Sequence, residues 1–193
     1  MDILKKSSCG FQSISLDTAL LDQRKVFLNG TITTESVGLV IKELLYLKSV
    51  DNTIPIQLYI NSTGGSVSAA LALYDLLKGM NNVDIYCYEI AASIAAVILA
   101  GGQRGHRFIL NHSKVLIHEP LVSSDSGGLC GSASEIVKSA EDIMKTKKTL
   151  IKLLSMDTGR TFDEIEKAIS FDNLMSADEA VSFGICDAIV NHM

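Results

Sequence analysis

The sequence predicts a single α/β domain, because short strand-like segments alternate with helical segments along its whole length. Its 193 residues are enough to bury one hydrophobic core, and 47% apolar against 20% charged residues is typical of folded chains. Three serine or threonine residues are each followed three positions later by glutamate, a spacing that marks helix starts. We therefore expect residues 1–193 to form one domain that contains both strands and helices.

The strand predictions come from six short segments that are apolar and rich in β-branched or aromatic residues. They are Lys25–Leu28, Ile56–Ile60, Val83–Tyr88, Arg107–Leu110, Lys114–Ile117 and Ile185–Val190. Helical segments separate several of them, as in other α/β domains. No repeat at a fixed period and no low-complexity tract interrupts this organisation.

The helix predictions rest on the three capping boxes, which pair Ser132 with Glu135, Thr161 with Glu164, and Ser176 with Glu179. The first box opens a long amphipathic helix from Ala133 to about Met156, which Gly159 stops. A helix this long either protrudes and packs on another subunit, or lies across its own core. Its apolar positions are Ile136, Ala140, Ile143, Met144, Leu150, Ile151 and Leu154. The preceding segment, Val122–Gly131, is rich in serine and glycine and predicts a loop.

Composition argues against several classes of function. A net charge of −5 does not suit a nucleic-acid-binding protein, which needs a basic surface to neutralise phosphates. The longest apolar run, Ile90–Ala100, is too short to cross a bilayer, and we expect no secretory signal and no membrane partner. The cysteines lie far apart without metal-ligand spacing, so we expect reduced thiols in a cytoplasmic protein without metal or cofactor. They are Cys9, Cys87, Cys130 and Cys186.

The first candidate for chemistry is a glycine pair, Gly64 and Gly65, between a hydrophobic strand and a helix. Glycines there let the backbone approach a ligand and point free N–H groups at it. The alternative is a tight strand-to-helix turn that needs glycine only for its backbone conformation. Taken alone, the glycine pair favours that alternative.

The second candidate is Ser93, which follows a strand and precedes an apolar helix that ends near Ala100. One interpretation is a helix cap made by the serine hydroxyl. The other is a nucleophile on a sharp strand-to-helix turn, with the Ile94 N–H free to stabilise an oxyanion. The Gly-x-Ser-x-Gly motif of α/β-hydrolases is absent.

His118 and Asp172 complete the candidate set. His118 ends an apolar strand just before Glu119 and Pro120, and Asp172 lies between two predicted helices. Each residue alone has an ordinary interpretation, as a structural histidine and as a turn aspartate. Serine, histidine and aspartate in one chain, however, are the residues of a nucleophile, a general base and the group that orients the base.

Together these residues resemble the ClpP family, the proteolytic subunit of the ATP-dependent caseinolytic (Clp) protease. The resemblance runs from about Leu20 to Val190, and the spacing of 118 − 93 = 25 residues from Ser93 to His118 is also like the family's. Its markers, in chain order, are Tyr59-Ile60-Asn61-Ser62, Gly64-Gly65, Ala91-Ala92-Ser93, Arg107-Phe108, Ile117-His118, Pro120-Leu121, Thr158-Gly159, Ile165-Glu166, Asp172, Met175-Ser176-Ala177 and Glu179-Ala180.

The resemblance implies a ClpP/crotonase-like core of repeated strand–strand–helix units with a protruding handle helix, here residues 133–156. It implies a serine endopeptidase that hydrolyses peptides and unfolded proteins through an acyl-enzyme intermediate. Ser93 would be the nucleophile, His118 the base and Asp172 the third member, with the backbone N–H groups of Gly65 and Ile94 as the oxyanion hole. The implied assembly is heptameric rings stacked in pairs around a chamber, opened by an AAA+ ATPase.

The chain also departs from the family pattern at several positions. Around Ser93, isoleucine and alanine at 94 and 95 replace methionine and glycine, which should narrow the pocket. The aromatic pair that helps to dock the ATPase keeps only Tyr59, because the other position is Gln57. A charged pair used between rings is replaced by Ser170-Phe171, and residues 1–16 are unlike the usual axial loop. The 122–131 loop is longer than usual.

Two alternative functions follow from the same resemblance. The chain could be a ClpP paralogue of low intrinsic activity that serves as a structural or regulatory component of a mixed ring with a second paralogue. It could instead be a crotonase-type acyl-CoA enzyme, which shares the core and uses backbone N–H oxyanion holes. Retention of Ser93, His118 and Asp172 argues against the first, and the lack of an adenine-nucleotide motif argues against the second.

Overall fold

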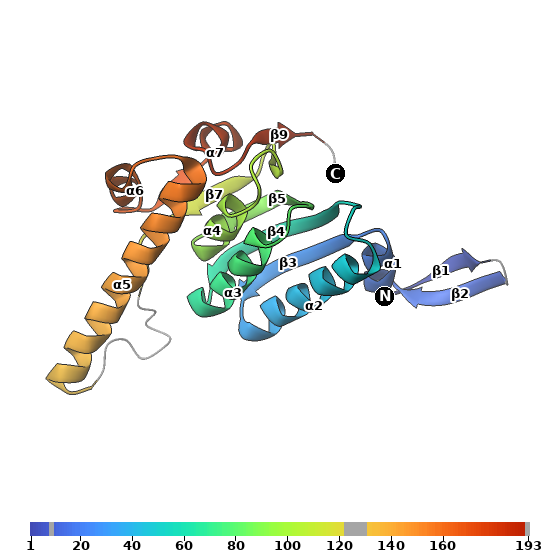
Figure 1. The fold of residues 1–193 in the computed structure, drawn as a ribbon, viewed down its shortest axis with the longest axis horizontal. Helices are drawn as coiled ribbons and strands as arrows, with labels where there is room; N and C mark the ends of the chain where they lie inside the picture. Colours follow the sequence, from blue (N-terminus) through green and yellow to red (C-terminus); the bar gives the residue numbers. More distant parts are fainter. Residues whose placement is uncertain (8–9, 122–130, 192–193) are drawn as a thin grey trace.

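The computed structural model describes residues 1–7, 10–121 and 131–191 (Figure 1). The strands are β1 (Asp2–Ser7), β2 (Gly10–Ser15), β3 (Lys25–Ile32), β4 (Ile56–Gly65), β5 (Val83–Ala92), β6 (Arg107–Leu110), β7 (Lys114–Ile117), β8 (Asn173–Met175) and β9 (Ala188–Val190). The helices are α1 (Leu16–Asp22), α2 (Thr34–Val50), α3 (Val67–Lys78), α4 (Ile94–Ala100), α5 (Ala133–Thr158), α6 (Phe162–Ala168) and α7 (Ala177–Phe183).

The main sheet is parallel along its path β3-β4-β5-β6-β9, which confirms the α/β fold class. β5 is long enough to pair with two strands in succession. Its residues 85–87 pair with β6 and its residues 90–92 pair with β7, so the sheet divides towards the carboxyl end of β5. The short strand β8 then adds to β7 in the antiparallel direction. This fork brings β7 and β8 beside the end of β5.

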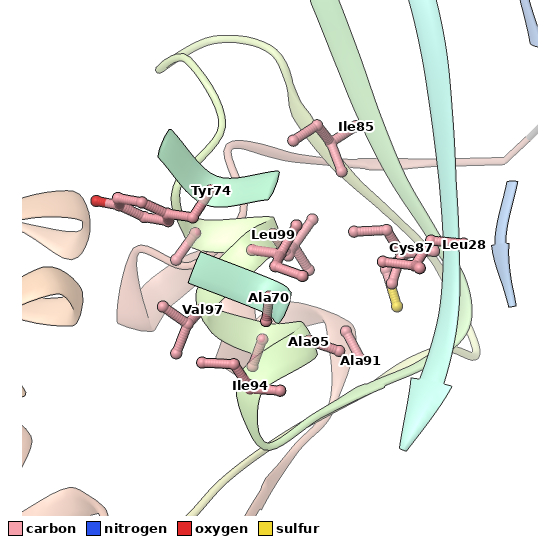
Figure 2. Close-up of a cluster of buried hydrophobic side chains, with 14 of the residues drawn as sticks. Leu28, Ala70, Tyr74, Ile85, Cys87, Ala91, Ile94, Ala95, Val97 and Leu99 are labelled. Atoms are coloured by element: carbon pink, nitrogen blue, oxygen red, sulfur yellow. The ribbon is translucent and has the colours of Figure 1, made fainter. Parts of the chain in front are cut away.

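The helix α4 is the centre of the hydrophobic core, because every one of its residues, 94–100, is buried. Its alanines allow α3, α5 and the sheet to approach it closely, and Figure 2 shows Ile94, Val97 and Leu99 within this cluster. At its end a side chain on Gly101 would collide with the ring of Tyr74, at 2.4 Å. The position that starts α4 is therefore fixed by close packing.

The buried guanidinium of Arg107 ties several elements to this core. It pairs with Asp187, with Nε 2.9 Å from Oδ2. Its Nη1 donates hydrogen bonds to three backbone carbonyls, at the ends of α4, α5 and α7. The carbonyls belong to Ala100, Asp157 and Gly184. Arg107 thereby satisfies helix-end carbonyls that would otherwise be buried without a partner.

The predicted elements are largely confirmed. All three capping boxes are present, and α5 ends at a left-handed Gly159 with φ of 79°. β6 and β7 have the predicted bounds, whereas β3, β4 and β5 extend further than predicted. The predicted strand Ile185–Val190 was wrong at its start, since β9 begins at Ala188. The N–H groups of Ile185 and Cys186 instead bind the Ala180 carbonyl of α7.

Several elements had no signal strong enough to predict them. α2 begins with a capping box in which Ser36 replaces the usual glutamate. β1 and β2 pair in the antiparallel direction and extend away from the sheet (Figure 1). β8 has only three residues. Most of the predicted 122–131 loop lies outside the described residues, and so do Cys9 and Cys130.

The two halves of α5 differ in their surroundings. Leu150 and Leu154 are buried in the chain's own core, as the second predicted alternative requires. The half around Val137 and Met144 extends beyond the body of the fold, with those side chains 59% and 50% exposed (Figure 1). Within the described ranges, no helix combines the length and apolar character required to span a membrane.

Candidate active site

The glycine pair at the end of β4 lies directly beside Ser93. A Cβ added to Gly64 would stand 2.8 Å from the Cβ of Ser93, and one added to Gly65 would stand 2.3 Å from the Ile32 carbonyl oxygen. Both glycines have positive φ, 98° and 148°. Only glycine allows this backbone to approach the serine so closely. Gly65 and Ser93 line the same pocket.

Ser93 has a backbone conformation that is rare outside glycine, with φ of 58° and ψ of −126°. Arg24 is the one other non-glycine residue with positive φ in the part of the chain that the structure describes. The Ser93 side chain makes no capping hydrogen bond to α4, so the helix-cap interpretation is wrong. Strain of this kind persists where surrounding packing enforces it, and it is concentrated at functional sites.

Two backbone N–H groups at this turn differ in their hydrogen bonding: that of Ser93 is bonded within the fold, and that of Ile94 is not. The Ser93 N–H donates to the Leu116 carbonyl at 2.8 Å, which fixes the end of β5 against β7. Ile94 is the first residue of α4, and its N–H has no acceptor within the helix. Its side chain is buried, so the peptide is held rigidly. The Ile94 N–H is therefore available to a ligand at the start of α4.

The strand register explains why His118 comes close to Ser93. Ala92 of β5 pairs with Leu116 of β7, so the residues that follow these two partners leave the sheet at the same edge. Ser93 and His118 are among them, and both line the pocket. Two residues separated by 25 positions in the sequence are thus brought together by one parallel pairing.

The antiparallel pairing of β7 with β8 brings Asp172 to His118. Ile117 pairs with Asn173, so the next residue of β7 and the preceding residue of β8 face each other. The His118 Nδ1 lies 3.7 Å from the Asp172 Oδ1. The His118 side chain is 15% exposed, and that of Asp172 is 77% exposed.

The three side chains are close, but they are not joined by hydrogen bonds in the isolated chain. A separation of 3.7 Å is an ion-pair distance and is too long for a hydrogen bond. The Ser93 hydroxyl has no hydrogen-bond partner within the described residues. Such contacts are often loose without substrate and tighten in the complex.

The pocket beside these residues is small and mainly apolar, with a volume of about 130 Å³. Its polar side chains are those of Ser93 and His118, and α4 and α5 each supply two apolar residues to its walls. Figure 2 shows two of the wall residues, Ile94 and Val97, on α4. The other lining residues are Gly65, Val67, Ile117, Pro120, Leu121, Leu150, Leu154 and Ile169. This shape suits an apolar side chain next to a reactive bond.

Two features of the structure were not found by sequence reasoning. Lys147 of α5 forms an ion pair with Glu119, the residue after His118, at 2.6 Å. Tyr59 is one ring of an aromatic row that crosses four neighbouring strands, with ring centroids 5.0–5.2 Å apart. The row consists of Phe27, Tyr59, Tyr86 and Phe108. The strand register could have suggested the row, whereas nothing in the sequence signals the ion pair.

The described cysteines do not compete with Ser93 as nucleophiles. Cys87 and Cys186 are free and buried. Burial raises the pKa of Cys87 to about 12 and also raises the pKa of Cys186, so both remain thiols at neutral pH. Among the residues that the structure describes, no group of three or more histidine, cysteine or acidic side chains could hold a metal ion.

One comparison with known proteins bears on this site. The family model described as Clp protease matches residues 8–193, which is almost the whole chain. The match includes every residue of the candidate site.

Proposed function

Since this chain belongs to the Clp protease family, we propose that it is a serine endopeptidase subunit whose nucleophile is Ser93. In this proposal His118 is the general base and Asp172 orients it. The backbone N–H groups of Gly65 and Ile94 form the oxyanion hole. The whole of residues 1–193 acts as one peptidase domain without a cofactor.

One observation carries this proposal: three separate strand ends converge on Ser93. Ser93, with its strained backbone, directly follows β5, His118 directly follows β7, and Asp172 directly precedes β8. The pairings β5–β7 and β7–β8 fix this arrangement in the backbone. A serine hydrolase requires these three groups: a nucleophile, a general base and a carboxylate that orients the base.

The proposed reaction proceeds through an acyl-enzyme. The Ser93 Oγ attacks the scissile carbonyl while His118 accepts its proton, and the charge of the tetrahedral intermediate develops near Gly65 and Ile94. His118 then gives the proton to the leaving amine, and water repeats the sequence to release the acid product. Asp172 stabilises the imidazolium and holds its tautomer. One oxyanion donor is typically worth roughly 3–4 kcal/mol of the barrier.

The pocket supports peptides and unfolded proteins as substrates. Its apolar walls would accept an apolar side chain adjacent to the scissile bond, and His118 is among its lining residues. A folded protein could not insert a backbone segment into so small a cavity. Extended chains are therefore the substrates that fit.

We also propose that the subunit acts within rings. Large apolar side chains are exposed on α2 and on the free half of α5, as expected of surfaces that a partner covers. The proposed assembly is heptameric rings stacked in pairs in the cytoplasm, served by an AAA+ ATPase. The exposed apolar residues in question are Leu39, Leu45, Tyr46 and Val50 of α2 and Ile136, Val137 and Met144 of α5.

A fluorophosphonate probe tests the proposed nucleophile, because it forms a covalent bond only with an activated serine. We expect one probe per chain, attached to Ser93, and complete loss of labelling in Ser93→Ala. The variant should keep the assembly and unfolding temperature of the wild type. Labelling that persists at another serine would contradict the assignment.

The same experiment distinguishes the alternative of a paralogue in a mixed ring. A subunit with low intrinsic activity would be labelled slowly alone and faster after mixing with a second ClpP-type subunit. A structural subunit would not be labelled in either state.

A further inference from the structure

The ion pair between Glu119 and Lys147 is the one charged connection that the structure gives between α5 and the segment carrying His118. Glu119 directly follows His118 in the chain. The Glu119 Oε2 lies 2.6 Å from the Lys147 Nζ, within hydrogen-bond distance. Lys147 is only 17% exposed at its side chain, so the pair is partly shielded from solvent. Such a pair is stronger than one between two exposed side chains.

Glu119 is held by its backbone as well as by its side chain. Its N–H donates to the Ile169 carbonyl, at the end of α6, with a distance of 3.0 Å. Its neighbours His118 and Pro120 both line the pocket. A displacement of Glu119 would therefore move the residue that carries the imidazole.

Lys147 lies on the face of α5 that covers the pocket. Leu150 and Leu154 follow it at three and seven positions, a spacing that keeps residues on one side of a helix. Both leucines are buried and line the pocket that contains Ser93. The pair thus joins this face of α5 to the segment after β7.

The other support of His118 is weak by comparison. The Asp172 carboxylate is 77% exposed and lies 3.7 Å from the imidazole, without a hydrogen bond. Phe171, next to it, is 86% exposed. An exposed ion pair at this distance contributes little to holding a ring in place. His118 therefore needs a second constraint.

We infer that Glu119 and Lys147 are positioning residues, whose ion pair fixes the His118 segment to α5 and so sets the imidazole towards Ser93. This inference rests on the proposed function. Neither residue touches the substrate, and both act through His118. A small misplacement of a catalytic group can cost up to about 100-fold in rate.

The test measures covalent labelling of the full chain by a fluorophosphonate, with the maximal rate separated from the half-saturating concentration. Glu119→Gln and Lys147→Met should each lower the maximal rate by about 10-fold, while the half-saturating concentration changes less than about twofold. The double exchange Glu119→Lys with Lys147→Glu restores the pair and should recover most of the rate. Lys145→Met is the matched control, since the Lys145–Asp142 pair on the same helix is exposed.

Each outcome bears on the inference. Single variants that label at the wild-type maximal rate would overturn it, and so would an equal loss in Lys145→Met. Loss of rate that accompanies a lower unfolding temperature, without recovery in the double exchange, would assign the pair a merely structural role and would also overturn it. A wild-type chain that is not labelled at all would overturn the proposed function and this inference together.

Discussion

The two sides of the candidate site differ in how firmly the chain itself holds them. The Ser93 side is built from β4, β5 and α4, where the glycines, the serine backbone and all of α4 are fixed by close packing. The Asp172 side is built from strands of three and four residues, and its carboxylate is 77% exposed. The proposed nucleophile and oxyanion donors are thus preorganised by one chain. The orientation of the proposed base depends on weaker contacts that other subunits could strengthen.

The largest expected effect concerns the weakly held side. Asp172→Asn should lower peptide turnover by about 10⁴-fold, because the amide stabilises the wrong histidine tautomer and cannot stabilise the imidazolium. The exposed position of Asp172 means that unfolding should be unaffected. Steady-state hydrolysis of an unstructured peptide, together with thermal unfolding, measures both. A loss below tenfold would show that Asp172 does not orient His118.

The firmly held side is tested by adding one methyl group. Gly65→Ala should lower turnover by about 10²–10³-fold, because the new Cβ would collide with the Ile32 carbonyl and displace the oxyanion donor. The collision should also strain the backbone around Ser93, so the free energy of unfolding should fall by about 1–3 kcal/mol. Peptide hydrolysis and urea unfolding provide these values.

Gly38→Ala is the control for this substitution. Gly38 lies within α2, and a Cβ there would meet nothing within 4 Å. Alanine should stabilise the helix by about 0.5–1 kcal/mol without changing turnover. If both glycine variants kept full activity, the close approach of β4 to Ser93 would have no catalytic role.

The elements of the fold differ in how well the sequence predicts them. Chemistry that is local in the sequence was predictable: the capping boxes, α5 with its Gly159 stop, and most strands. α2 was missed because its capping box uses Ser36 in place of glutamate. β8 was missed because three residues carry no periodic signal, although it is this strand that brings Asp172 to His118.

The site itself was predicted only through the joint occurrence of its residues. Ser93, His118 and Asp172 each had an ordinary interpretation, and the resemblance to a family gave them roles. The Ser93 side chain makes no capping hydrogen bond, which excludes the helix-cap interpretation, and sequence alone could not reveal this. The Glu119–Lys147 pair joins residues 28 positions apart, so only the packing of α5 shows it.

A smaller effect on peptidase activity is expected when contacts between subunits are weakened. If subunit contacts complete the Asp172 side, then specific activity should fall on dilution as rings separate. Phe171→Ser should shift this fall to higher protein concentration by a few-fold, because Phe171 is 86% exposed beside Asp172 and is available to a partner. Peptidase rate and mass by analytical ultracentrifugation would be followed together.

Phe11→Ser controls for the loss of an exposed aromatic ring, since Phe11 lies on β2 and is 73% exposed. Phe11→Ser should leave the dependence of specific activity on protein concentration unchanged. Full activity in a monomer at every dilution would show that the Asp172 side needs no partner.

The smallest effect on activity is expected from a change at Asp187, which pairs with the buried Arg107 and does not line the pocket. Burial alone would raise the pKa of Asp187, but the hydrogen bonds and charge of Arg107 outweigh burial and hold that pKa below its usual value. The ionised form is therefore favoured by folding. Its contribution to stability is complete above the unfolded-state pKa of about 3.9 and is lost as pH falls through the lower folded-state value.

Asp187→Asn should accordingly reduce the free energy of unfolding by about 1–3 kcal/mol at pH 7, and the difference from wild type should shrink below about pH 4. Urea unfolding at several pH values measures it. Asp22→Asn is the control, because the Lys5–Asp22 pair is about half exposed and should contribute less than about 1 kcal/mol at any pH. Turnover per folded molecule should be unchanged in both variants, since neither residue lines the pocket. A pH-independent loss in Asp187→Asn would mean that shape, and not charge, is what Arg107 requires at this position.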